Sequence, residues 1–170
     1  MVNKKDVQIA FEPIGYIFAV LLFSILAMFI FRELNIEHLG DILFFIPRSV
    51  FIVVGILLIV LFSFTFIYGM HDFNKNSSFP AKHLIVNGMY RYVRHPIYSG
   101  ISITVMGLGL LYESTGFLFG GILWLILFYT QARNEEKHLT EIFKDTYVHY
   151  KTSTPMYFPD FFRLIKDLFE

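Results

Sequence analysis

The chain has 170 residues, of which 55% are hydrophobic, 19% are aromatic and only 16% are charged, and its mean hydropathy is +0.57. Soluble domains carry about 25% charged residues, so this composition predicts a protein embedded in lipid. The 14 basic and 14 acidic residues balance, which removes the positive surface typical of nucleic-acid-binding proteins. Because the sequence contains no cysteine, it excludes disulfides, thiolate metal sites and cysteine nucleophiles.

Uncharged stretches long enough to cross a bilayer predict four transmembrane helices, at residues 14–31, 49–70, 97–112 and 114–131. We therefore predict an all-α, polytopic membrane protein with a single membrane domain over residues 1–170. Little more than Glu113 separates the last two spans, so they are expected to form a tight antiparallel hairpin. Glycines in these two spans are expected to allow close packing of the helices: Gly107, Gly109, Gly116, Gly120 and Gly121.

The distribution of Lys and Arg predicts which connections share one side of the membrane. All basic residues except Arg32 and Arg48 lie before the first span, between the second and third, or after the fourth. Basic residues are retained on the cytoplasmic side of membrane proteins. Both termini, the polar segment 71–95 and the chain after residue 131 are therefore predicted to be cytoplasmic, where the two polar segments can meet.

The two polar segments differ in their predicted structure. Residues 72–80 are rich in Asn and Ser and end at Pro80, which predicts a loop, and Asn87-Gly88 indicates a turn. Residues 131–150 carry apolar side chains at helical spacing, which predicts that the fourth helix continues beyond the membrane. Residues 161–169 alternate apolar and charged side chains, as in a short amphipathic helix on a membrane surface.

Two clusters at the predicted membrane surface are candidates for chemistry. Residues 88–100, GMYRYVRHPIYSG, bring two arginines, a histidine and three tyrosines to the start of the third span. Residues 133–136, RNEE, offer a guanidinium group and two adjacent carboxylates, whose interactions partial desolvation strengthens. Each cluster also has a purely structural interpretation, as membrane anchors, an aromatic belt or a solvated helix start.

Spacing argues against several other kinds of site. Glu135-x-x-His138 is half of a di-iron carboxylate pattern, but the other half is missing. The six histidines include no pair of the H-E-x-x-H kind, so no metal site is predicted. No charged residue lies inside a predicted span, which argues against a channel or a pump.

The two clusters resemble the isoprenylcysteine carboxyl methyltransferase and phospholipid methyltransferase superfamily. The similar residues are the run 84–100, LIVNGMYRYVRHPIYSG, and then 133–136 with Leu139, Phe143, Tyr147, Tyr150 and Pro155. The order of the two motifs and the hairpin-length gap between them match the family, and the resemblance covers roughly residues 80–159. The chain departs from the family at Met89, where proline is usual, and at Lys144, where glycine is usual.

The resemblance implies a methyltransferase that binds S-adenosylmethionine at the cytoplasmic membrane face and takes a lipophilic acceptor from the bilayer. It implies that residues 1–70 form scaffold and acceptor channel and residues 71–159 the cofactor-binding core. Residues 160–170 are the tail whose residue pattern predicts an amphipathic helix. The cofactor-binding residues it implies are Leu84, Val86, Gly88, Tyr90, His95, Pro96, Tyr98, Glu135 and Glu136. Arg94 and Arg133 are the candidates for orienting the acceptor.

A guanidinium fork suits a carboxylate or a phosphate better than an amine. This preference favours a carboxylate acceptor of the isoprenylcysteine type, while methylation of a phospholipid amine or a thiol stays open. Two further functions also stay open. One is a sterol-type membrane reductase that uses NADPH, although its chains are usually much longer. The second is a non-enzymatic membrane protein, which would leave the paired motifs unexplained.

Overall fold

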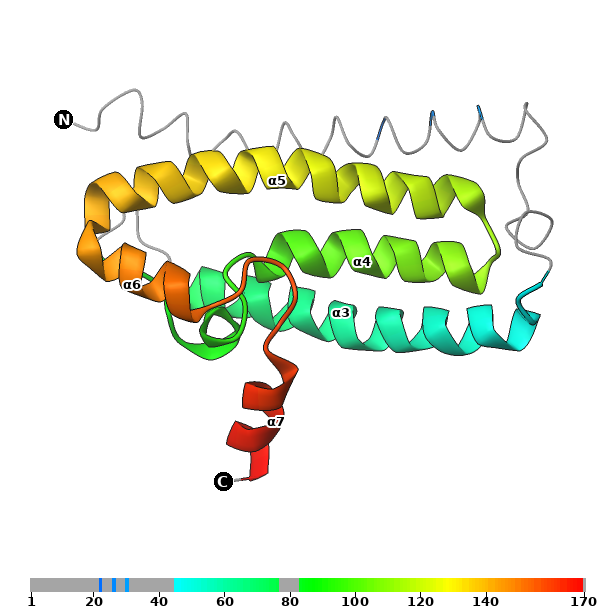
Figure 1. Ribbon diagram of the computed structural model, residues 1–170, viewed down its shortest axis with the longest axis horizontal. Helices are drawn as coiled ribbons and strands as arrows, with labels where there is room; N and C mark the ends of the chain where they lie inside the picture. Colours follow the sequence, from blue (N-terminus) through cyan, green and yellow to red (C-terminus); the bar gives the residue numbers. More distant parts are fainter. Residues whose placement is uncertain (1–21, 23–25, 27–29, 31–44, 77–82, 170) are drawn as a thin grey trace.

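The computed structural model describes residues 22, 26, 30, 45–76 and 83–169, and every regular element in this part of the chain is helical. Three helices lie side by side and alternate in direction: α3 (Arg48–Asn76), α4 (Pro96–Leu111) and α5 (Thr115–Phe143) (Figure 1). A short 3₁₀ helix, η1 (Gly88–Arg91), precedes α4. Two short helices, α6 (Asp145–Ser153) and α7 (Phe161–Phe169), follow α5.

Two of these helices, α3 and α5, have 29 residues each and are long and apolar enough to cross a membrane. Helix α4 is also apolar but has only 16 residues. The predicted all-α class and the hairpin of the last two apolar segments are confirmed. The predicted first span, 14–31, lies outside the described residues except Leu22, Leu26 and Ile30, which are helical and exposed.

Close approach between the helices depends on glycine, as the sequence predicts. A Cβ atom at Gly109 would lie 2.6 Å from the backbone nitrogen of Leu118, across the α4–α5 hairpin. A Cβ atom at Gly107 would lie 3.0 Å from the carbonyl oxygen of Gly55 on α3. Backbone groups cannot move aside as flexible side chains can, so these two glycines set the spacing of the three helices.

The prediction of a loop at residues 72–80 is wrong for its first part, because α3 continues to Asn76. The Asn76 side chain donates a hydrogen bond to the carbonyl oxygen of Asp72 (2.8 Å) and stabilises the last turn. The Asp72 carboxylate accepts a hydrogen bond from the backbone N–H of Met89 (2.7 Å). A polar helix end thus joins α3 to η1.

The prediction of one continuous helix over residues 131–150 is also wrong. Helix α5 ends at Phe143, and α6 begins at Asp145. Lys144 between them has φ 48° and ψ −125°, a conformation that glycine adopts far more readily than lysine. This break turns α6 back beneath the end of α5, toward η1 (Figure 1).

The two polar segments meet at one end of the helix bundle. At the opposite end, Arg48 at the start of α3 forms an ion pair with Glu113 (2.7 Å) in the turn between α4 and α5. Residues 71–76, η1 and the end of α5 therefore lie together, as expected from the alternating direction of the helices. Which side of the membrane this end faces stays a prediction.

We expect Lys144→Gly to stabilise the protein, because it removes the Cβ atom from a backbone conformation that disfavours side chains. The expected gain in the free energy of unfolding is about 1 kcal/mol, or about 2–4 °C in the midpoint of thermal unfolding. Thermal unfolding in detergent measures it, with Lys144→Ala as the control that keeps the Cβ atom. An unchanged or lower midpoint for the glycine variant would contradict this account of the break.

Candidate functional site

The segment before α4 depends on a tight turn at Gly88. This glycine has φ 62°, and a Cβ atom there would lie 2.1 Å from a carboxylate oxygen of Asp72. Only glycine therefore allows the Asp72 carboxylate to reach the N–H of Met89. The turn fixes the start of η1 and, through it, the chain leading to Arg94 and His95.

Arg94 and His95 are held by backbone hydrogen bonds to the loop after α6. The N–H of Arg94 donates to the carbonyl of Pro155 (2.9 Å), and the N–H of His95 donates to that of Met156 (3.1 Å). The Tyr150 hydroxyl on α6 donates to the carbonyl of Tyr90 (2.6 Å). Chain segments about 60 residues apart thus fix the backbone of the first motif.

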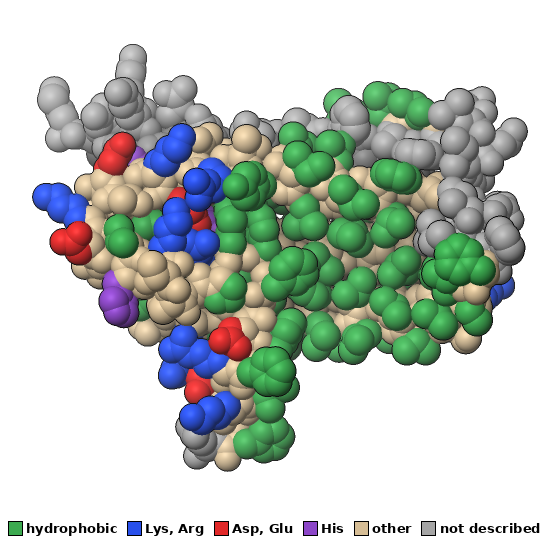
Figure 2. Space-filling model, in the orientation of Figure 1, with side chains coloured by type: hydrophobic (Ala, Val, Ile, Leu, Met, Phe, Trp, Pro, Cys, Tyr) green, Lys and Arg blue, Asp and Glu red, His purple; other side chains and the backbone are tan. Residues whose placement is uncertain are grey.

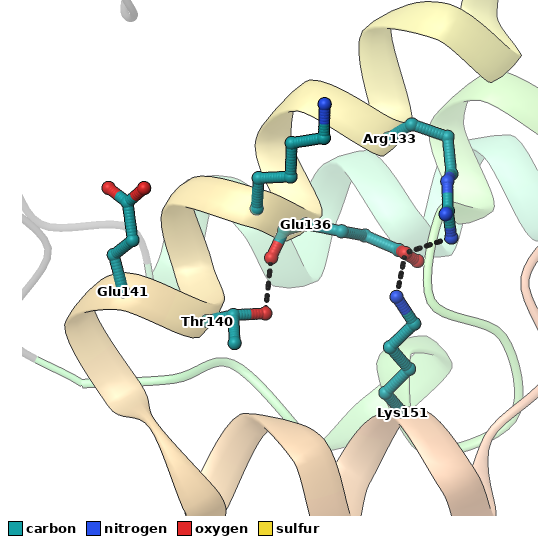
Figure 3. Close-up of a pocket in the computed structure, with 6 residues that line it drawn as sticks. Arg133, Glu136, Thr140, Glu141 and Lys151 are labelled. Atoms are coloured by element: carbon teal, nitrogen blue, oxygen red, sulfur yellow. Dashed lines mark hydrogen bonds and ion pairs between the residues drawn. The ribbon is translucent and has the colours of Figure 1, made fainter.

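Glu136 on α5 is the centre of a buried ionic cluster. Its side chain is 1% exposed, yet three permanent cations lie close to its carboxylate oxygens. The nearest nitrogens belong to Lys151 on α6 (2.8 Å), Arg94 (3.0 Å) and Arg133 (3.5 Å). The Nε2 atom of His95 lies 3.5 Å from the same carboxylate. Figure 3 shows Arg133 and Lys151 converging on Glu136 from two helices.

Glu135 lies beside this cluster and contacts α4. Its carboxylate accepts a hydrogen bond from the Tyr98 hydroxyl and lies 3.7 Å from the Nδ1 atom of His95. The rings of His95 and Tyr98 are nearly parallel, with centroids 5.6 Å apart, and Tyr98 stacks in turn on Phe128 at 4.6 Å. These stacked rings fix the side chains that separate the two carboxylates from the apolar helices.

Three tyrosines around the cluster remain protonated hydrogen-bond donors. Burial raises the pKa of Tyr90, Tyr150 and Tyr157, and the negative charge of Glu135 raises the pKa of Tyr90 and Tyr157 further. The Tyr157 hydroxyl is buried and makes no hydrogen bond to any residue that the structure describes. It is therefore a donor available to a ligand.

The cluster has two features of a binding site for a polar, charged ligand. Among the described residues, the buried Nε of Arg94, Nε2 of His95 and both carboxylate oxygens of Glu136 make no hydrogen bond of good geometry. Three permanent cations face two carboxylates, so positive charge is in excess. A pocket of about 300 Å³ opens onto the cluster and is lined by Arg133, Glu136, Lys137, Thr140, Glu141 and Lys151 (Figure 3).

The structure brings together six of the residues singled out in the sequence: Arg94, His95, Tyr98, Arg133, Glu135 and Glu136. Gly88, Tyr90 and Pro96 lie in the segment that leads to them. Leu84 and Val86 are half-buried in the irregular chain before Gly88. The roles of all these residues stay predictions.

Sequence reasoning misses three residues of the site, which are Asp72, Lys151 and Tyr157. Asp72 falls in the predicted loop, and Lys151 counts only as a basic residue of the C-terminal segment. No local sequence pattern marks Lys151 or Tyr157. Lys151 reaches the site because the chain turns at Lys144, and Tyr157 reaches it because the chain turns again at Pro155. The one signal in the sequence is that Lys151 directly follows Tyr150 of the second motif.

Comparison with known proteins agrees with the motifs. The family described as phospholipid methyltransferase matches residues 50–146. A protein-S-isoprenylcysteine O-methyltransferase of Schizosaccharomyces pombe is 37% identical over 79 residues, which cover 45% of this chain and 33% of that protein. One of Saccharomyces cerevisiae is 33% identical over 116 residues, covering 63% and 48%.

The chain thus matches less than half the length of each of these curated relatives. No solved structure matches it significantly. The family match covers nearly all of α3 and the whole of η1, α4 and α5, and ends two residues after Lys144. It therefore contains the first motif, the RNEE run of the second motif, and Arg94, His95, Arg133, Glu135 and Glu136 of the ionic cluster. The chain therefore belongs to the phospholipid methyltransferase family.

Proposed function

We propose that this chain is an integral membrane methyltransferase that transfers a methyl group from S-adenosylmethionine to a lipophilic carboxylate of the isoprenylcysteine type. The observation that carries the proposal is the contact between the two motifs at Glu136, a buried carboxylate beside Arg94, His95 and Arg133. The family match and the names of the two relatives support methyl transfer.

The residues of the cluster fit the polar groups of S-adenosylmethionine. Carboxylates such as Glu135 and Glu136 suit the ammonium group and the ribose hydroxyls. The buried Nε–H group of Arg94 and hydroxyl of Tyr157, which lack partners among the described residues, suit the carboxylate. The buried polar atoms that lack good hydrogen bonds within the described residues match this need for a polar ligand. When bound, the cofactor would supply a methyl group already activated by the positive sulfonium.

The protein's own task is then to position groups and to exclude water. Tyr98 and Glu135 hold each other in place, and the stack of His95, Tyr98 and Phe128 closes the cluster on the side of the apolar helices. A carboxylate acceptor is ionised at neutral pH and needs no base to become a nucleophile. No group in the cluster has to remove a proton, which agrees with the fully protonated tyrosines around it.

The acceptor-orienting role fits Arg133 better than Arg94. The Arg94 side chain is 10% exposed and lies 3.0 Å from Glu136, so it serves mainly to neutralise that carboxylate. Arg133 is 47% exposed, is 3.5 Å from Glu136 and lines the open pocket. Its guanidinium group can turn toward an incoming carboxylate without leaving Glu136 unpaired.

The family description favours one further candidate, a phospholipid amine as acceptor. A cationic pocket wall repels a protonated amine, and this repulsion makes the carboxylate the better fit. Ligand binding distinguishes the two methyltransferase candidates from the remaining functions. A reductase of the sterol type would bind NADPH, and a non-enzymatic anchor would bind neither NADPH nor S-adenosylmethionine.

The first test is the binding of S-adenosylhomocysteine to detergent-purified protein, measured by calorimetric titration with NADPH as the comparison ligand. We expect S-adenosylhomocysteine alone to bind. His95→Ala and Glu135→Gln should each weaken this binding about tenfold, the equivalent of 1.4 kcal/mol, because the first removes a buried polar partner and the second removes a negative charge that suits the ammonium group. His149→Ala, on the exposed side of α6, is the matched control and should bind as the unmodified protein does.

Unchanged affinity in both site variants would show that the cofactor lies elsewhere. Binding of NADPH alone would move the chain to the reductases, and binding of neither ligand to folded protein would favour the anchor.

Lys151 is expected to act as a positioning residue that holds Glu136. Its amine lies 2.8 Å from the carboxylate and its side chain is 35% exposed, so the pair is partly screened by water. Lys151→Met should weaken S-adenosylhomocysteine binding about fivefold to tenfold, and Lys151→Arg should restore most of the affinity. Equal losses in both variants would mean that the size of the side chain, and not its charge, matters at this position.

The acceptor can be identified from the chemistry of the product. We expect radioactive methyl groups from S-adenosylmethionine to appear on a farnesylated cysteine with a free carboxylate, and mild base to release them as methanol, as for an ester. The carboxamide of the same compound is the matched control and should accept nothing. Arg133→Gln should raise the KM for this acceptor and leave the KM for S-adenosylmethionine unchanged. Base-stable label on phosphatidylethanolamine would instead identify an amine acceptor.

A further inference from the structure

Helix α7 extends away from the three-helix bundle and points across the direction of α3 (Figure 1). Its attachment is well defined. The rings of Phe158 and Phe161 pack edge-on against Phe62 of α3, with centroids 6.3 and 6.2 Å away. Asp160 begins the helix by accepting hydrogen bonds from the N–H groups of Arg163 (3.0 Å) and Leu164 (2.9 Å).

A second set of contacts fixes α7 at the polar end of α3. Asp167 on α7 accepts a hydrogen bond from the Tyr92 hydroxyl (2.8 Å) and forms an ion pair with Arg91 (3.2 Å). Arg91 is the last residue of η1, which the Asp72 carboxylate connects to the end of α3. Helix α7 therefore lies at the level where α3 changes from apolar to polar.

The two sides of α7 have opposite chemistry. Phe162, Ile165 and Phe169 follow one another at intervals of three and four residues and form one stripe, which we call the α7 stripe. They are 91%, 52% and 87% exposed. Arg163 and Asp167 lie on the other side of the helix, and Lys166 lies at the edge of the stripe. Figure 2 shows the apolar side of α7 continuing into the apolar surface of the bundle.

We propose that α7 lies in the headgroup layer of the membrane, with the α7 stripe in the outer acyl chains and Arg163 and Lys166 at anionic lipid headgroups. This placement rests on the membrane location in the proposed function. A helix in the membrane plane must run across the spanning helices, expose an apolar stripe toward the bilayer and carry cations on the remaining surface. Helix α7 meets all three conditions.

A lipid surface fits the α7 stripe better than a protein partner does. Three side chains on a nine-residue helix offer far less area than the roughly 800 Å² per partner of a stable protein interface. The apolar side of α7 continues into the apolar surface of the bundle (Figure 2), and α3 exposes apolar side chains such as Val60, Leu61 and Phe64, which would face lipid in a spanning helix. One apolar solvent therefore accounts for both surfaces.

Because the sequence contains no cysteine, single cysteines can be introduced for spin labelling without first removing native ones. Single cysteines at positions 162, 165, 169, 163 and 166 would be labelled in the full chain, reconstituted at one molecule per nanodisc. Electron paramagnetic resonance then compares the access of oxygen, which concentrates in lipid, with that of a water-soluble nickel chelate. Position 163 is the matched control on the other side of the same helix, position 166 marks the edge of the stripe, and positions 162 and 169 test the stripe independently.

We expect labels at 162, 165 and 169 to favour oxygen, the label at 163 to favour the nickel chelate, and the label at 166 to give an intermediate ratio of the two. The stripe labels should report greater depth when phosphatidylglycerol is added to phosphatidylcholine. Nickel access at all five positions would overturn the proposal, and stripe labels shielded from both reagents would mean that protein covers the helix. Equal depth in the two lipid mixtures would overturn the role of anionic headgroups.

These measurements need no cofactor, so their outcome is separate from that of the methyltransferase proposal. Binding of S-adenosylhomocysteine to the same samples shows which of the two proposals has failed.

Discussion

The neutralisation of one buried carboxylate, Glu136, is the constraint on which the polar end of this protein depends. Removing a carboxylate from water costs several kcal/mol, and only well-placed cations and hydrogen bonds offset this cost. Its cations come from three parts of the chain: Arg94 before α4, Arg133 on α5 and Lys151 on α6. The carboxylate can therefore be buried only when these segments have come together.

The backbone arrangement around the cluster follows from this requirement. The loop after α6 accepts the N–H groups of Arg94 and His95, while Tyr92 accepts that of Asp160 at the start of α7. These bonds do not depend on the side chains, so they hold the two motifs at a fixed distance whatever the cluster binds. Helix α7 is tied to the same segment through Asp167, which connects a surface element with the site.

Much of this arrangement is predictable from sequence, and the failures have a common cause. Apolar runs define α3, α4 and α5, and the alternation of spans already brings Arg94 and Glu136 to one end of the bundle. The extension of α3 to Asn76 is not predictable from local pattern, because Asp72 is stabilised there by Met89, a contact 17 residues away. The break at Lys144 is equally hidden, since lysine rarely adopts a positive φ.

The break at Lys144 also explains why the sequence predicts one half of the cluster and misses the other. A helix continuing through residue 150 would carry Lys151 away from Glu136, because fifteen residues of straight helix span about 22 Å. The reversal at Lys144 instead returns α6 to the level of Glu136 and brings the Tyr150 hydroxyl to Tyr90. One strained backbone position thus folds a linear second motif back on itself, so that α6 forms one wall of the site.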